Sequence, residues 1–289
     1  MPRYLGKLPS GASKNSGLYP LTGTGPNSVF GRIKAGAWSG FYSPPLENLP
    51  AQSNLVAFWD AADIGSWSGS GTWNNLVTSP ADGAAQSAYD LQLGSTSGSD
   101  ANDPTFVGTP GGLSSSEFWS LSDTTGFELP SNTTFTSTMH RSDSVWTLGY
   151  IIDVASDTSW YIASTLPSGS ASNRGFFVTH SHMQNINAGG YPLQSWTPGS
   201  NFKRFTVSLD GDVNPVWEYS IDGTLTTPSR APATDTSSTA DRTLMIANTN
   251  GYGGGISGGK LYAVVLWNKR LSAAEVTQFN NAFAARFGY

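Results

Sequence analysis

The segment Lys260-Leu-Tyr-Ala-Val-Val-Leu-Trp267, followed by Asn268-Lys-Arg-Leu-Ser-Ala-Ala-Glu275, decides the fold of this chain. Its first half is rich in β-branched and aromatic residues and is apolar at successive positions. Such a run predicts a strand buried on both faces within a stack of sheets. In the second half, Ser272 is a suitable helix N-cap and Glu275 completes a capping box. We therefore expect a buried strand that leads directly into a helix.

The helix is expected to be amphipathic and to lie at the end of the chain. Leu271 and Val276 occupy the two positions of a hydrophobic staple, and Gly288 is expected to end the helix. Apolar residues recur at helical spacing and form one narrow stripe, which consists of Val276, Phe279, Phe283 and Phe287. Arg286 is expected to face away from this stripe.

The buried strand, the motif at 268–275 and the short terminal helix together resemble the closing segment of the concanavalin A-like lectin and glucanase superfamily, in its laminin-G-like (LamG) branch. Segment 241–250 stands where such domains have their penultimate strand, and 205–223 looks like their hairpin. Segment 55–60, with Trp73 downstream, looks like their opening strand and first loop. The resemblance covers residues 54–289 and implies an all-β fold, a two-sheet antiparallel jelly-roll sandwich with a short C-terminal helix.

Composition supports a fold of many short strands joined by turns. The chain contains 33 Gly and 17 Pro, and only 12% of its residues are charged. Cysteine is absent, which excludes disulfides, thiolate metal sites and a Cys nucleophile. The strands expected from apolar runs are 55–60, 105–108, 117–121, 126–129, 145–154, 159–164, 175–180, 203–209, 216–221, 243–247 and 260–267. Alternation predicts that Trp146, Leu148, Tyr150, Ile152 and Val154 share one face.

Residues 1–53 differ from the rest and are expected to form an extended, Pro- and Gly-rich arm. The net charge of the chain is −5; residues 1–50 carry +4, so the remainder carries −9. The arm is more apolar than a solvated tether needs, so we expect it to anchor on a surface; a disordered tail is the alternative. The residues expected to anchor it are Arg3, Tyr4, Lys7, Tyr19, Phe30, Arg32, Trp38 and Phe41.

Glycosidases of the superfamily that the chain resembles use paired carboxylates about 5 Å apart. The glutamates of this chain are scattered, and Glu218 is expected on the solvent face of a hairpin. No nucleophile elbow, phosphate loop or dinucleotide motif is present. We therefore expect no enzymatic activity and no catalytic residues.

No metal site is expected from the residue pattern. Segment 210–214 begins like a calcium loop, but Pro215 stands where that loop requires Gly. His180 and His182 lack a third ligand. No cofactor is expected; the LamG resemblance alone implies at most a single weakly held calcium ion.

Sugar recognition is the function that these exclusions leave. Sugars bind by stacking their CH faces on exposed aromatic rings. Rings within Gly-, Ser- and Asn-rich loops are the candidates for carbohydrate binding: Trp67, Trp73, Tyr191, Trp196 and Tyr252. The alternative is that these rings cap the ends of the sandwich.

The setting follows from charge and from the N-terminal sequence. The acidic body argues against nucleic acid as a partner, and no apolar run predicts a membrane span or a signal peptide. We therefore hypothesise a non-enzymatic structural protein of a bacteriophage, a capsid decoration or fibre-type protein. It would assemble in the host cytoplasm and lie on the virion surface, where its arm contacts capsid or tail proteins and copies of itself. Its lectin-like head would bind cell-surface glycans. The alternatives are a secreted carbohydrate-binding module, an adhesin or a glycoside hydrolase.

Overall fold

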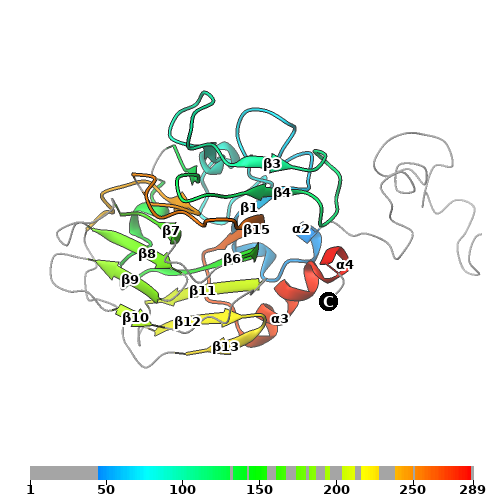
Figure 1. Cartoon of the computed structure of the whole chain (residues 1–289). Coiled ribbons are helices and arrows are strands. Elements are labelled where there is room, and N and C mark those ends of the chain that lie inside the picture. The colour runs from blue at the N-terminus through cyan, green and yellow to red at the C-terminus, as the bar shows by residue number, and fades with distance from the viewer. Residues whose placement is uncertain are drawn as a thin grey trace, which may run out of the picture. The chain divides into compact units, whose positions relative to one another are not determined.

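The computed structural model describes most of the chain from residue 45 onward (Figure 1). The described residues are 45–130, 133–141, 143–154, 161–166, 174–179, 182–186, 193–195, 204–211, 216–227, 238–249 and 251–287. The chain divides into two compact units, Met1–Ser43 and Pro44–Tyr289, and the second contains every element given below. The predicted anchoring residues lie outside the described residues: Arg3, Tyr4, Lys7, Tyr19, Phe30, Arg32, Trp38 and Phe41.

The larger of two sheets has eight strands in the order β13-β12-β11-β6-β15-β4-β3, with β1 also paired to β15 (Figure 1). Its strands are β1 (Leu55–Asp60), β3 (Thr105–Val107), β4 (Phe118–Ser120), β6 (Val145–Asp153), β11 (Arg204–Asp210), β12 (Val216–Ile221), β13 (Thr224–Thr226) and β15 (Lys260–Trp267). The strand β15 that the sequence singles out therefore lies inside this sheet, hydrogen-bonded to β1, β4 and β6.

The smaller sheet has seven strands in the order β10-β9-β8-β7-β14-β5-β2. Its strands are β2 (Gln92–Leu93), β5 (Phe127–Glu128), β7 (Tyr161–Ser164), β8 (Gly175–Thr179), β9 (His182–Ile186), β10 (Leu193–Ser195) and β14 (Met245–Ile246). The pairings between these described strands are antiparallel. The predicted all-β, two-sheet antiparallel sandwich is confirmed.

In the described residues, helices are few and short. They are α2 (Pro45–Asn48), α3 (Ala273–Ala282) and α4 (Ala284–Phe287), with single 3-10 turns at Gln52–Asn54, Gln86–Tyr89 and Thr136–Thr138. Figure 1 shows α3 and α4, in red, at the C-terminal end of the chain. The predicted short C-terminal helix is confirmed, with a break at Phe283. Among the described residues, no helix has the length and apolarity needed to cross a membrane.

The main core lies between the two sheets. This core includes four alternate residues of β6 and one residue just after it, which confirms the predicted alternation: Trp146, Leu148, Tyr150 and Ile152, then Val154. Side chains of the smaller sheet complete it, Phe176 and Val178 of β8 among them. The interior is therefore filled by residues that alternate along each strand.

A second core lies on the other face of the larger sheet, beneath the C-terminal helices. Val276, Phe279 and Phe283 are buried in it, which confirms the helical stripe. β15 contributes to both cores, with Val264 and Leu266 in the first and Val265 and Trp267 in the second. A strand that is buried on both faces must be apolar along its buried length, as this one is from Leu261 to Trp267; only its first residue, Lys260, is exposed.

The predicted arm extends too far into the chain. Residues 45–53 pack on the sandwich, because Leu49 is buried in the second core and the indole of Trp267 donates to the carbonyl of Pro50 at 2.9 Å. The boundary of the compact body therefore lies at residue 44 rather than 54.

The predicted helix start is present in full. The N–H of Glu275 donates to the hydroxyl of Ser272 at 3.4 Å, and the N–H of Ser272 donates to the Glu275 carboxylate at 2.8 Å. Glu275 also pairs with Lys269 at 2.5 Å. Each end of this capping box therefore satisfies an N–H group that the helix itself leaves without a partner.

Replacing Ser272 by Ala removes the N-cap and is expected to lower the free energy of unfolding by about 1 kcal/mol. Ser272→Asp is the matched control, because its carboxylate still accepts the N–H bond and is expected to retain most of the stability. Urea denaturation monitored by tryptophan fluorescence measures both. Equal stabilities for the Ala and Asp variants would contradict the role of the cap.

Candidate functional site

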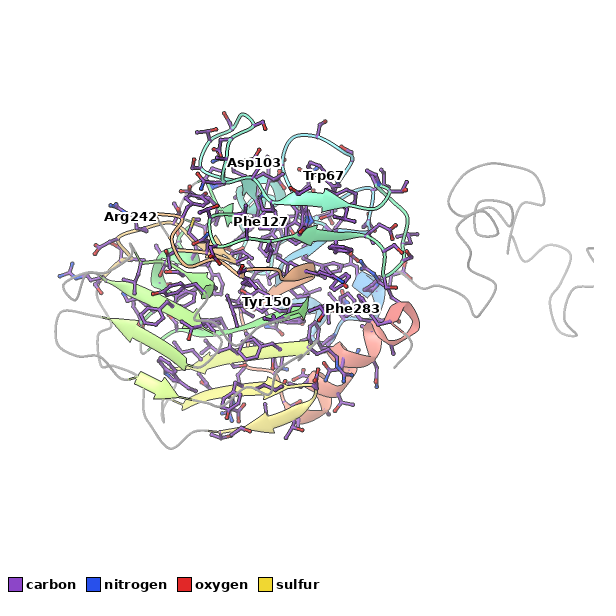
Figure 2. The ribbon with its side chains drawn as sticks, in the orientation of Figure 1. Trp67, Asp103, Phe127, Tyr150, Arg242 and Phe283 are labelled. Carbon is purple, nitrogen blue, oxygen red and sulfur yellow. The ribbon has the colours of Figure 1, made fainter. Side chains whose placement is uncertain are left out.

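Two of the predicted sugar-binding rings lie in the core. Trp73 is fully buried and Trp67 is 6% exposed. Both pack edge-on against Trp119, with ring centroids 4.7 Å away for Trp67 and 5.7 Å for Trp73. Figure 2 shows Trp67 among other side chains of this region. Because neither ring offers an open face, the interpretation of Trp67 and Trp73 as sugar platforms is corrected: they fill the end of the sandwich.

Tyr191 and Trp196 lie outside the described residues, and their assignment stays a prediction. Tyr252 is the remaining predicted ring, and it is half-buried on the loop that follows β14. Its backbone has a φ of 51°, in the left-handed region that non-glycine residues rarely adopt. Its hydroxyl donates to the carbonyl of Gly94, so the ring is held at both ends.

Three aromatic residues in the described part of the chain belong to neither core: Tyr161, Phe177 and Tyr252. All three are half-buried. We call them the outer aromatic set. Every other described Trp, Tyr and Phe is buried in a core or packed against one. Because these three rings are half-buried and lie outside both cores, this set is the candidate for ligand contact.

Strand alternation places two of these rings on the outer face of the smaller sheet. Phe176 and Val178 point into the core, so Phe177 between them points outward. Tyr161 on β7 is paired with Thr179, which lies on that same outward face. The rings of Tyr161 and Phe177 meet edge to face at 5.5 Å, with 77° between their planes. Two adjacent strands therefore present an ordered aromatic pair.

The loop after β14 connects Tyr252 to this pair. Gly254 accepts a hydrogen bond from the N–H of Tyr161 at 2.9 Å, and a Cβ at Gly254 would lie 2.9 Å from the Tyr161 ring. Because Gly254 also has a φ of +131°, only glycine fits here without strain. The buried Asn248 anchors the loop by donating to the carbonyls of Asp123 and Thr125. The loop thus lies against the outward pair, two residues from Tyr252.

Carboxylates surround the hydroxyl end of Tyr252. A Cβ at Gly94 would lie 2.2 Å from an oxygen of Asp103 and 2.6 Å from one of Asp100, so both carboxylates converge on the residue that binds the Tyr252 hydroxyl. Glu128 lies on β5, which pairs with the strand that ends next to Gly94. Burial raises the pKa of Tyr252, and the nearby charges of Glu128, Asp100 and Asp103 raise it further.

Asp100 itself organises this loop. Slight burial acts to raise its pKa, but hydrogen bonds from the Ser95 hydroxyl and N–H and from the N–H of Asn102 lower the pKa below its usual value. Its carboxylate is therefore ionised at neutral pH. No local sequence pattern indicates this cluster, because Asp100 and Asp103 approach Gly94 only in the folded chain.

The expected position of Glu218 is wrong. Its side chain is buried, and both oxygens are occupied: Arg270 donates to each of them, and Thr227 donates to one at 2.7 Å. Arg270 belongs to the terminal motif and also contacts Asp210 at 3.4 Å. Glu218 therefore holds that motif to the hairpin and has no free carboxylate oxygen for acid catalysis.

The single weakly held calcium ion that the LamG resemblance implies stays a prediction. In the part of the chain that the structure describes, no group of three or more His, Cys, Asp or Glu side chains is placed to hold a metal ion together. The nearest approach is the pair Asp100 and Asp103, in which only Oδ1 of Asp103 is buried without a hydrogen-bond partner. The predictions for His180 and for the segment at 212–215 fall outside the described residues.

No protein-family model matches this sequence, and no curated protein does. Among solved structures, the chain is similar to Trypanosoma rangeli sialidase in complex with the inhibitor DANA: 11% identity, a TM-score of 0.49, and coverage of 87% of this chain and 38% of that chain. It is also similar to the binding domain of botulinum neurotoxin serotype D, with 10% identity, a TM-score of 0.49, and coverage of 79% and 51%. A leech intramolecular trans-sialidase is similar with 14% identity, a TM-score of 0.42, and coverage of 56% of this chain and 26% of that chain.

The chain thus spans about half or less of the length of these structures. The prediction that it is not an enzyme is contradicted by the comparison and is wrong as stated, because sialidases are enzymes. At 11–14% identity, no catalytic residue and no substrate is carried over to this chain.

Proposed function

We propose that this chain binds glycans on the outer face of its smaller sheet, and that the outer aromatic set is the platform. The observation that carries the proposal is that Tyr161, Phe177 and Tyr252 are half-buried and lie outside both cores. Sugar rings bind to aromatic faces through their CH groups, and rings that are already fixed lose little conformational entropy on binding.

Several contacts support such preorganisation. The Tyr252 hydroxyl bond to Gly94 fixes one ring, and the edge-to-face contact with Phe177 fixes that of Tyr161. The loop at 251–255 lies beside Tyr161, whose N–H donates to the carbonyl of Gly254 at 2.9 Å, and its other backbone groups can form the hydrogen bonds that sugars require.

Tyr161→Ala and Tyr252→Ala are each expected to weaken binding to an oligosaccharide by about tenfold, since loss of one aromatic contact costs about 1 kcal/mol or more. Tyr252→Phe is the matched control for the ring: it removes the bond to Gly94 but keeps the face, so most of the affinity is expected to remain. Isothermal titration calorimetry of a glycan-array hit measures all three. Unchanged affinity in both alanine variants would refute the proposed platform.

We further propose the setting that the sequence suggests: a surface protein of a larger assembly, a bacteriophage capsid decoration or fibre-type protein. In it, the N-terminal residues contact capsid or tail proteins and copies of the same chain, and a LamG-like head faces outward. The support is the Pro-rich, apolar, basic character of residues 1–43 ahead of an acidic body. The virion location and the absence of a required cofactor stay predictions.

Replacing Trp38 and Phe41 together by Ser is expected to abolish incorporation of the full chain into particles while leaving glycan affinity unchanged. The reason is that both residues lie in the unit that precedes the sandwich. Quantitative mass spectrometry of purified virions measures incorporation, and Tyr161→Ala serves as the control that incorporates normally. Wild-type incorporation of the double variant would contradict the anchoring role.

A further inference from the structure

We infer that the outer aromatic set takes glycans without negative charge, neutral hexose oligosaccharides, and rejects sialylated, uronic and sulfated glycans. The inference rests on the proposed function, because it names the class of sugar for that same site. What carries it is the position of three carboxylates around one of the rings.

The carboxylates are placed by the fold at the hydroxyl end of Tyr252. Asp100 and Asp103 approach the Cα of Gly94, whose carbonyl accepts the Tyr252 hydroxyl. Glu128 follows on the neighbouring strand β5, where it accepts the Thr243 hydroxyl at 2.8 Å. Figure 2 shows Asp103 on a loop at the edge of the molecule. An approaching sugar that stacks on Tyr252 therefore meets this group of charges.

These charges have no cationic partner in the described part of the chain. The ion pairs there join Arg141, Arg204, Lys269, Arg270 and Arg286 to other acids, and none includes Asp100, Asp103 or Glu128. The raised pKa of Tyr252, to which all three acids contribute, agrees with a negative local potential. Among the described residues no cation pairs with these carboxylates, so a ligand at Tyr252 is exposed to their negative potential.

The sign and range of the effect follow from elementary electrostatics. Like charges separated by a few ångströms at a protein surface repel each other measurably, and salt screens the repulsion over a distance of about 10 Å at 0.1 M ionic strength. An anionic group on the sugar is thus penalised most at low salt. A neutral sugar of the same shape has no such penalty, so charge rather than shape separates the two classes.

The test compares a neutral oligosaccharide with its sulfated form, using the full-length protein and calorimetry at low and at high salt. We expect the sulfated form to bind at least about fivefold more weakly at low salt, with the gap shrinking as salt rises. Glu128→Gln is expected to reduce the difference in affinity between the neutral and the sulfated form at low salt. The matched control is Glu47→Gln. Glu47 is on α2, which lies on the side of the larger sheet, so this variant is expected to leave the difference in affinity unchanged.

The outcomes separate the two proposals. Equal or tighter binding of the sulfated form, abolished by Tyr161→Ala, would overturn the inference on charge while the platform stands. The inference on charge would also be overturned if the difference in affinity between the neutral and the sulfated form were the same at both salt concentrations. The same holds if neither Glu128→Gln nor Asp103→Asn reduced that difference. If neither form binds and no other neutral glycan does, the proposed function itself fails.

Discussion

Arg286→Met is expected to lower the free energy of unfolding by about 3–5 kcal/mol, because it leaves one buried carboxylate without its partner. Arg286 and Asp60 form an ion pair at 2.6 Å in which each side chain is 1% exposed. The guanidinium also donates to the carbonyls of Ser114 at 2.8 Å and Glu117 at 3.0 Å. This one side chain therefore joins the C-terminal helix to the first strand and to the loop before β4.

Equilibrium urea denaturation measures the loss. Arg242→Met is the matched control, because Arg242 is exposed and its guanidinium contacts only a neighbouring backbone carbonyl, so a change below about 0.5 kcal/mol is expected. The double variant Asp60→Asn with Arg286→Met is expected to be more stable than Arg286→Met alone, since no uncompensated charge remains. A loss of less than about 1 kcal/mol in Arg286→Met would show that the pair is not buried as described.

Trp73→Ala is the second large effect, with an expected loss of about 3–5 kcal/mol from the cavity that it leaves. Trp73 is fully buried and contacts Trp119 and Phe127, with centroids 5.7 Å and 4.7 Å away. Its backbone also exchanges hydrogen bonds with Leu91. The same substitution at a sugar platform would reduce binding and leave stability almost unchanged.

Thermal and urea unfolding of Trp73→Ala and Tyr252→Ala distinguish these roles. We expect Trp73→Ala to lose most of its stability and Tyr252→Ala to lose about 1 kcal/mol or less, because Tyr252 lies outside both cores. Equal losses would contradict the assignment of Trp73 to the core and of Tyr252 to the surface.

The fold could be predicted from local signals that survive in the structure. The run from Leu261 to Trp267 is apolar because it contributes to both cores, and the capping box of Ser272 and Glu275 forms as expected. The strands that sequence missed are β2, β9, β10 and β13, which are two to five residues long. Such short strands owe their conformation to their neighbours rather than to a period of their own.

The site could be predicted only in part. Tyr252 was found because a ring in a glycine-rich loop is unusual, but the same reasoning selected Trp67 and Trp73, which the sandwich buries. Tyr161 and Phe177 were missed because one outward ring on a strand looks like any other strand aromatic until the register is known. Arg286 was expected on the polar side of its helix; its partner lies 226 residues earlier in the chain, so no local pattern reveals it.

NMR titration of the full chain with a neutral oligosaccharide, using ring-labelled tyrosine and phenylalanine, tests the account most directly. If the outer aromatic set is the binding platform, the ring signals of Tyr161, Phe177 and Tyr252 will shift together and saturate as the sugar is added. The indole N–H signals of Trp67 and Trp73 would stay in place. Shifts of the two indoles with static signals for the outer aromatic set would contradict it.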